Sequence, residues 1–327
     1  MTLRTLRNWK RLDPEEPVAP PGRPRLGEDR LNEIRRLVRA QLDLQGWGTG
    51  EEPIHRALGG HWPRARVRRV LRELKQAHRR HEREVRAAVR TSVAVHYRDA
   101  IWSMDATHLG RELPGRAIQG EIVREVASTR TIGMAVGRAA TGAEVVTVLE
   151  RVAHERHGCP LVLITDNGGA YVSGAVGRWC QAHRVLHLFS MPRTPQHNAA
   201  SEHGMRELKH DAGLGKGELV LDVDQALAAL RASRDRIDTC RLRRTCGWRT
   251  AVQADCSTPH WSVRVSRREL WEWATCAIDR ALQDCPGKRA RRRAVREAIY
   301  ATLAHFAVIT RTRGGRPWPA QVAEGVS

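Results

Sequence analysis

The sequence predicts an α/β domain, built on a five-stranded mixed sheet with flanking helices, that is preceded by an all-α domain. Three observations lead to this expectation. Between residues 28 and 76 the apolar residues recur at helical spacing. From residue 99 onwards they occur in short runs rich in β-branched residues, which are typical of strands, and these runs then alternate with helical segments. The basic charge lies at the two ends of the chain and leaves the α/β part neutral.

The chain has 327 residues, enough for two or three domains, and its formal net charge is +20. Residues 1–98 carry 23 Lys/Arg against 12 Asp/Glu, residues 99–214 carry 12 against 12, and residues 215–327 carry 21 against 12. A neutral centre between basic ends indicates a catalytic core flanked by segments that hold a polyanion such as DNA. Arginine-rich helix faces exposed to solvent would produce the same composition, so this alternative stays open.

Seven cysteines are present, none before Cys159 and none in a CxxC pair. An odd count without a signal peptide favours a reduced compartment over a disulfide framework. No run approaches the ~18–20 apolar residues of a membrane span. We therefore expect a cytoplasmic, nucleoid-associated protein with no membrane partner.

Residues 1–27 are read as a basic terminus and a proline-rich linker. Within the linker, Arg23 and Arg25 lie in the motif GRPR. Arginines on an extended, proline-stiffened chain can enter a narrow minor groove of DNA. A plain linker is the alternative.

Residues 28–90 are predicted to form a helix-turn-helix DNA-binding domain. Helices are expected over residues 28–45, 51–58 and 62–76, separated by GWGTG and GGH turns. The third helix would enter the major groove and contact DNA through its arginines. These are Arg64, Arg66, Arg68 and Arg69. A small helical bundle with a solvated arginine face is the alternative.

Residues 95–255 are predicted to form the catalytic core. A first strand begins near Asp99 and is expected to end at Asp105. The further predicted strands are 117–129, 130–138, 161–165 and 184–189, and the predicted helices are 142–157, 172–182, one from about 199, and 222–238. Residues 256–327 form a basic helical C-terminal region of unassigned fold. Its run PGKRARRRAVR is suited either to phosphate contact or to a solvated helix face.

Three acids are candidates for one metal site. Asp105 and Asp166 are expected at strand ends, and Glu202 lies in the first turns of a predicted helix, with 35 residues between it and Asp166. Taken singly, each has an ordinary structural explanation as a strand terminator, a turn residue or a helix cap. Together they can hold two divalent ions about 3.5–4 Å apart, an arrangement that suits in-line attack on a phosphodiester.

These acids and their neighbours resemble a known superfamily. The matching segments are WSMDAT, TDNG, PQHN and SEHGMRELK, followed by the basic RLRRTCGWRT. Over residues 95–255 the chain resembles the DDE integrase/transposase superfamily, particularly bacterial insertion-sequence transposases with a retroviral-integrase-type core. The helix-turn-helix pattern also resembles their usual N-terminal region. Gly169 and Ala170 depart from the family pattern, and the zinc-binding His/His/Cys/Cys module of retroviral integrases is absent.

The resemblance implies an RNase H-like fold and two Mg²⁺ or Mn²⁺ ions held by Asp105, Asp166 and Glu202. It also implies DNA cleavage and strand transfer during integration or transposition of a mobile element. Arg206 and Lys209 are expected to contact the DNA backbone, with a solvated helix face as the alternative. Further candidates for positioning water or phosphate are Asn167, His197 and Asn198.

The expected partners are DNA, both element ends and target, and further copies of the chain, because transposition joins two DNA ends. A second element-encoded DNA-binding protein is a possible partner. Two other functions remain open from the sequence. One is an RNase H-fold nuclease that cuts without strand transfer, and the other is a DNA-binding protein with an inactive integrase-like core.

Overall fold

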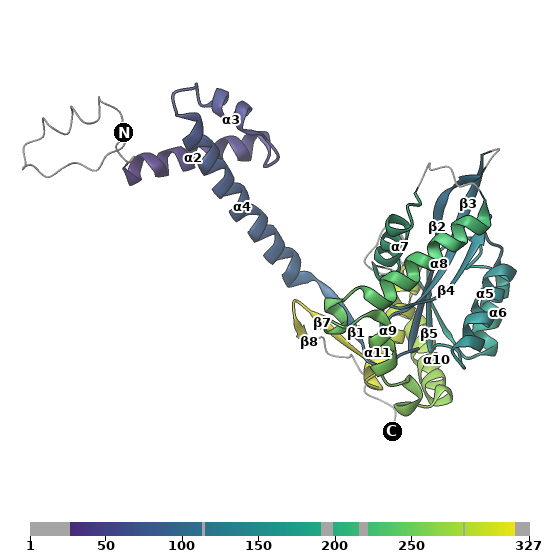
Figure 1. The fold of residues 1–327 in the computed structure, drawn as a ribbon. Helices are drawn as coiled ribbons and strands as arrows, with labels where there is room; N and C mark the ends of the chain where they lie inside the picture. The colour runs from purple at the N-terminus through teal and green to yellow at the C-terminus, as the bar shows by residue number, and fades with distance from the viewer. Residues whose placement is uncertain (1–26, 113–114, 191–198, 216–221, 284, 318–327) are drawn as a thin grey trace, which may run out of the picture. The chain divides into compact units, whose positions relative to one another are not determined.

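The computed structural model describes residues 27–112, 115–190, 199–215, 222–283 and 285–317 (Figure 1). By its internal contacts the chain divides into two compact units, Met1–Val89 and Arg90–Ser327. Across the described ranges, no helix combines the length and the apolar character that crossing a membrane requires.

The N-terminal unit consists of helices, as predicted. They are α2 (Glu28–Gln45), α3 (Glu51–Ala57) and α4 (Arg64–Val89). Their apolar faces meet in a core that includes Ile34 from α2, Ile54 from α3 and Val67 from α4. Helix α4 is longer than the predicted 62–76, because residues 77–89 contain no glycine or proline and continue the helix without an apolar stripe of their own.

The second unit is built on the five-stranded mixed sheet that the sequence predicted. Its strands are β2 (Ile101–Glu112), β3 (Arg116–Glu125), β4 (Thr131–Gly137), β5 (Val162–Thr165) and β6 (Leu186–Phe189). They lie in the order β4-β3-β2-β5-β6. Strands β2, β3 and β4 are antiparallel neighbours, whereas β5 is parallel to both β2 and β6.

The first strand does not end at Asp105, so that expectation was wrong. Asp105 lies in the middle of β2 and pairs with Ile122 of β3. The pairing continues to Glu112 and Arg116, with a register shift between His108 and Gly110.

Helices cover both faces of the sheet (Figure 1). Helices α5 (Gly142–Glu155) and α6 (Gly174–Ala182) pack on the face that carries Trp102 and Met104 of β2. Helices α7 (Ala199–Asp211) and α8 (Val223–Cys240) pack on the opposite face, against Leu109 and Ile122. Because side chains alternate along a strand, Ser103 and Asp105 point to the α7 face.

The C-terminal part of the chain also packs on this sheet. It contains η2 (Arg244–Cys246), α9 (Ala251–Ser257), η3 (Trp261–Val263), α10 (Arg267–Gln283), α11 (Lys288–His305), β7 (Ile309–Arg313) and β8 (Arg316–Pro317). Leu270 of α10 and Ile299 of α11 share a core with Val162 and Leu188. A small sheet pairs β1 (Thr91–Val95) with β7 and β7 with β8. The described residues beyond 256 are therefore part of the second unit.

Candidate active site

Asp105 and Asp166 lie on neighbouring parallel strands. The register pairs Ser103 of β2 with Ile164 of β5. Continued by two residues, this register brings Asp105 beside Asp166, which directly follows the last residue of β5. The two carboxylates thus lie side by side on neighbouring strands, at the point where β5 ends and β2 continues.

Glu202 is brought to the same face by the start of helix α7. It lies in the first turn of this helix and is half-buried. The preceding residue, Ser201, is 1% exposed, and its hydroxyl forms a short hydrogen bond with the hydroxyl of Ser103. Since Ser103 is two residues before Asp105 on the same face of β2, this bond ties the strand of one candidate acid to the helix of another.

A close contact between α7 and β3 sets the position of the helix. Arg124 of β3 is 3% exposed and donates to the carbonyl of Thr129. Its guanidinium lies against Gly204, where a Cβ atom would be 0.9 Å from Arg124 Nη1. Burial, together with the charge of Arg243, lowers the pKa of Arg124 to about 10. Only glycine at position 204 lets α7 approach the sheet this closely.

The basic segment after the core holds α7 from its outer side. Glu207 of α7 is 3.0 Å from Arg243 and 3.4 Å from Arg241, measured between carboxylate oxygens and guanidinium nitrogens. Arg243 and Glu207 are both largely buried. Part of the RLRRTCGWRT motif therefore supports the helix that carries Glu202.

The three candidate acids are close enough for their charges to interact. Burial, followed by the charge of Asp166, raises the pKa of Asp105 to about 7, and the charges of Glu202 and Glu121 add to this effect. The amide of Ala106, which donates to Asp105 Oδ1 at 2.9 Å, opposes it. Segments far apart in the sequence thus form one acidic cluster on the sheet.

Sequence reasoning missed Glu121 and Tyr171. Glu121 of β3 is 6% exposed and accepts a short hydrogen bond from the hydroxyl of Tyr171. Burial, with the charge of Asp166, raises the pKa of Glu121. Burial also raises the pKa of Tyr171, and the charge of Glu121 adds to this shift. The alternation of polar and apolar residues in QGEIVRE was the available signal, but it does not identify a buried partner 50 residues away.

The turn after Asp166 is closed by local hydrogen bonds. The amide of Gly168 donates to Asp166 Oδ1 at 2.8 Å, which is the pattern of an Asx turn. The side-chain amide of Asn167 donates to the carbonyl of Ser190 at 2.7 Å, just beyond β6. These bonds orient Asp166 and join the ends of β5 and β6.

The donor set fits a hard divalent cation, because Asp105, Asp166 and Glu202 offer only carboxylate oxygens. Burial raises the pKa of Asp105, and the charges of the neighbouring carboxylates add to this shift, which a bound cation would oppose. Among the residues that the structure describes, no three His, Cys, Asp or Glu side chains have the arrangement needed to hold a metal ion.

The predicted DNA-contact residues have different surroundings. Arg206 is exposed, and Lys209 is half-buried with Nζ 3.4 Å from the carbonyl of His108. On α4, Arg66 is half-buried, and the other three arginines make ion pairs within the N-terminal unit. These pairs are Arg64–Glu52, Arg68–Glu51 and Arg69–Glu73. Arg23, Arg25, His197 and Asn198 lie outside the described residues.

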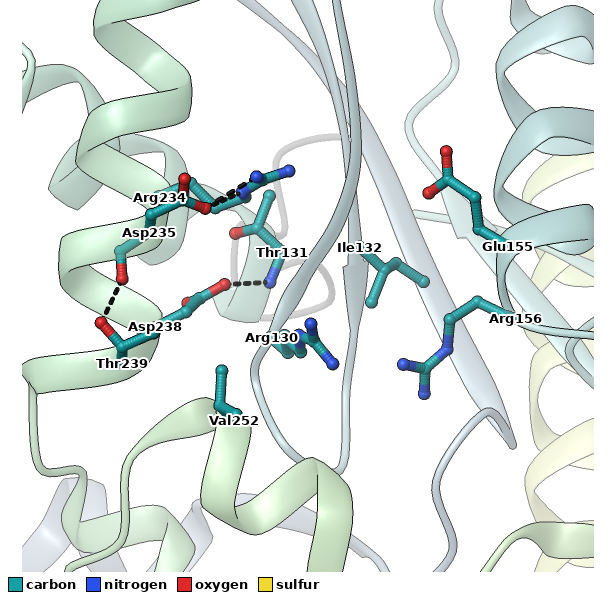
Figure 2. Close-up of a pocket in the computed structure, with 10 residues that line it drawn as sticks. All are labelled: Arg130, Thr131, Ile132, Glu155, Arg156, Arg234, Asp235, Asp238, Thr239 and Val252. Carbon is teal, nitrogen blue, oxygen red and sulfur yellow. Dashed lines mark hydrogen bonds and ion pairs between the residues drawn. The ribbon is translucent and has the colours of Figure 1, made fainter.

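A hollow of about 260 Å³ lies between β4, α5, α8 and α9 (Figure 2). Several of its charged groups are paired. Arg156 bonds Asp99 at 2.7 Å and Asp255 at 2.8 Å, and the Asp238 carboxylate accepts from the amide of Thr131 at 2.9 Å. This network joins α8 and α9 to the sheet and includes none of the candidate acids.

Residues 96–195 match the family model described as the integrase core domain. This stretch contains β2 to β6 with Asp105 and Asp166, and it ends before Glu202. No curated protein matches the chain.

Several solved structures are similar to the chain. The magnesium complex of the HTLV-2 integrase catalytic core, in its trimeric form, is 16% identical with a TM-score of 0.39, covering 49% of this chain and 97% of that one. The BIV integrase catalytic core is 18% identical with a TM-score of 0.37, at 48% and 94% coverage. The simian T-cell lymphotropic virus intasome with the PP2A regulatory subunit B56 gamma is 16% identical with a TM-score of 0.42, at 68% and 74% coverage.

Proposed function

We propose that the chain, whose residues 96–195 match the integrase core domain model, is a DDE transposase or integrase with an RNase H-like core. It would act as a two-metal-ion polynucleotidyl transferase that cuts DNA and joins the cut end to a target. One observation carries the proposal: Asp105, Asp166 and Glu202 come from two strands and a helix, yet they lie close enough that the charges of Asp166 and Glu202 add to burial in raising the pKa of Asp105 to about 7. Such a cluster of acids is unfavourable for folding and is typical of a functional site.

In this proposal Asp105, Asp166 and Glu202 hold two Mg²⁺ or Mn²⁺ ions. When bound, the ions would activate a water molecule or a DNA 3′-hydroxyl and would neutralise charge on the leaving oxygen. The protein's own part is to hold the carboxylates in place. The Ser103–Ser201 hydrogen bond fixes the start of α7, and the Gly168 amide orients Asp166.

The substrate in this proposal is DNA, both the element ends and the target. Helices α2 to α4 would read the element ends as a helix-turn-helix, with the arginines of α4 exchanging their exposed ion pairs for phosphates. Such pairs contribute only about 0–1 kcal/mol each, so the exchange costs little. Arg206, which is exposed one turn beyond Glu202, would contact the DNA backbone beside the acids. Lys209 donates one hydrogen bond to the carbonyl of His108, and its remaining N–H groups would contact the DNA backbone.

Joining two ends to a target requires more than one active site, so the working form would be a homo-oligomer. A second element-encoded DNA-binding protein is a further possible partner. Because its substrate would be the DNA of the mobile element's host, the protein would act in the cytoplasm, at the nucleoid.

Two alternatives share the same acids. A nuclease of this fold would cut without joining, and an inactive core would only bind DNA. The clustering of Asp105, Asp166 and Glu202 favours an active centre over an inactive one, because a core retained for binding alone has no use for repelling carboxylates.

The test is a cleavage and strand-transfer assay on supercoiled plasmid and on duplexes that carry the element ends, with Mg²⁺, Mn²⁺ or EDTA. Asp105→Asn, Asp166→Asn and Glu202→Gln should each lower the rate by about 100-fold or more. Glu272→Gln, an exposed acid paired with Arg268 on α10, is the matched control and should keep wild-type activity. Cleavage that survives in the three variants or in EDTA would refute the proposal. Cleavage without joined products would identify the nuclease.

A further inference from the structure

A basic cleft lies between the edge strand β6 and the first half of α11. It has a volume of about 490 Å³. We call it the α11 cleft and define it by Leu188, Phe189, Lys288, Arg291, Arg292 and Val295, which lie along its walls. Leu188 and Val295 provide apolar surface, the three cations line the α11 side, and the guanidinium of Arg292 lies 5.9 Å from the centroid of the Phe189 ring.

The cations in the first half of α11 have no acidic partner among the residues that the structure describes. Residues 288–296 read KRARRRAVR, with no acid before Glu297. Within the described ranges, no ion pair involves Lys288, Arg289 or residues 291–293. On α10, by contrast, Arg268 pairs with Glu272. Like charges at spacings of three and four residues repel by about 0.2–0.5 kcal/mol per pair, and cations in a first turn oppose the helix dipole. A bound anion would relieve both effects.

The α11 cleft is joined to the candidate active site by adjacent carbonyls. Arg296 of α11 is buried and donates from Nη2 to the carbonyl of Phe189 at 2.9 Å. Asn167, the residue after Asp166, donates to the next carbonyl, that of Ser190, at 2.7 Å. The cleft wall and the turn that carries a candidate metal ligand therefore share one stretch of backbone.

We propose that the α11 cleft binds the phosphodiester backbone of the DNA that enters the active site. The inference rests on the proposed function, which makes DNA the substrate. Charge complementarity identifies the occupant: three cations that make no ion pair with any described acid line one wall, and the half-exposed Phe189 ring offers a surface to a sugar or base. Phosphate contacts of this kind position the strand without reading its sequence.

The experiment measures binding of a fluorescent duplex by anisotropy in EDTA, over a range of salt concentrations. The test variant is Lys288→Gln/Arg291→Gln/Arg292→Gln. The control variant removes the same charge from exposed arginines on α6, on the loop before β6 and on α8, which likewise make no ion pair among the described residues. It is Arg178→Gln/Arg184→Gln/Arg231→Gln. Urea unfolding of both variants accompanies the binding curves.

The test variant should bind DNA at least about tenfold more weakly near 0.1 M salt. The slope of log affinity against log salt should become shallower by about 2–3, because each lost phosphate contact removes about 0.9 from its magnitude. Its stability should equal or exceed that of the wild type, because repulsion within α11 is removed. The control variant should lose less than about threefold in affinity. Equal losses in the two variants, or an unchanged slope in the test variant, would overturn the proposal.

A measurement on the wild-type protein covers the case of a variant that fails to fold. Acetylation of the exposed Lys288 by an amine-reactive ester, followed by mass spectrometry, should slow about tenfold or more when duplex DNA is present. Unchanged acetylation would overturn the proposal. Binding is measured in EDTA and so does not depend on cleavage. If the test variant loses affinity but the wild type never cleaves DNA, only the proposed chemistry is refuted. A protein that cleaves but binds equally without these charges would refute only the cleft.

Discussion

Replacing Gly204 by alanine tests whether the close approach of α7 to the sheet positions Glu202. The new Cβ would lie 0.9 Å from Nη1 and 2.0 Å from Cζ of Arg124. Arg124 is buried and donates to the carbonyl of Thr129, so its guanidinium has little freedom to move aside. Either this side chain leaves its place or α7, with Glu202 two residues upstream, shifts away from β2.

The magnitude follows from two opposing effects. Alanine in place of a helix-interior glycine gains about 1 kcal/mol from propensity. Overpacking a filled interior costs about 1–3 kcal/mol. Gly177 of α6 provides the matched control, because a Cβ there would meet no atom within 4 Å. Gly204→Ala should therefore be about 1–3 kcal/mol less stable than Gly177→Ala, and a shift of Glu202 by about 1 Å should lower the cleavage rate about 100-fold.

The assay combines urea unfolding with metal-dependent cleavage for both alanine variants. A double-mutant cycle with Arg124→Ala isolates the contact, since Gly204→Ala should cost nothing further once the guanidinium is gone. If Gly204→Ala is as stable and as active as Gly177→Ala, or if the cycle shows no coupling, then Arg124 does not hold α7 in place and the account of how Glu202 is positioned is wrong.

Three further predictions concern buried acids around the sheet. Burial raises the pKa of Glu125 from 4.5 to about 7, so the folded protein holds this proton more tightly than the unfolded chain does. As the pH rises from 4.5 to 7 in urea unfolding, the stability of the wild type should therefore fall by about 3 kcal/mol relative to Glu125→Gln, and a constant difference would contradict this. Tyr171→Phe removes the donor to buried Glu121 and should lower the unfolding free energy at pH 8 by about 1–3 kcal/mol; an unchanged midpoint would argue against the bond. Glu207→Gln leaves the largely buried Arg243 unpaired and should cost about 3 kcal/mol in the same experiment, whereas a loss below about 0.5 kcal/mol would show that the pair is not structural.

The elements of this protein could be predicted from its sequence because they depend on local patterns. The helical spacing of Ile34, Val38 and Leu42 predicts α2, and the apolar run before Asp166 predicts β5. The order of strands and helices then predicted a mixed five-stranded sheet. The same local patterns failed at Asp105, where an acid was read as a strand end although β2 continues, because pairing with β3 decides the length of the strand.

The sequence by itself determined most of the helices and strands between residues 28 and 238, the basic ends and the three candidate acids, since composition and periodicity are properties of neighbouring residues. Only the tertiary structure decided how the acids are held. The hydrogen bond between Ser103 and Ser201, the packing of Gly204 on Arg124 and the position of α11 beside β6 each join residues far apart in the chain. Such contacts arise from the packing of whole elements, and the local alternation of polar and apolar residues contains no record of which partner each buried group will meet.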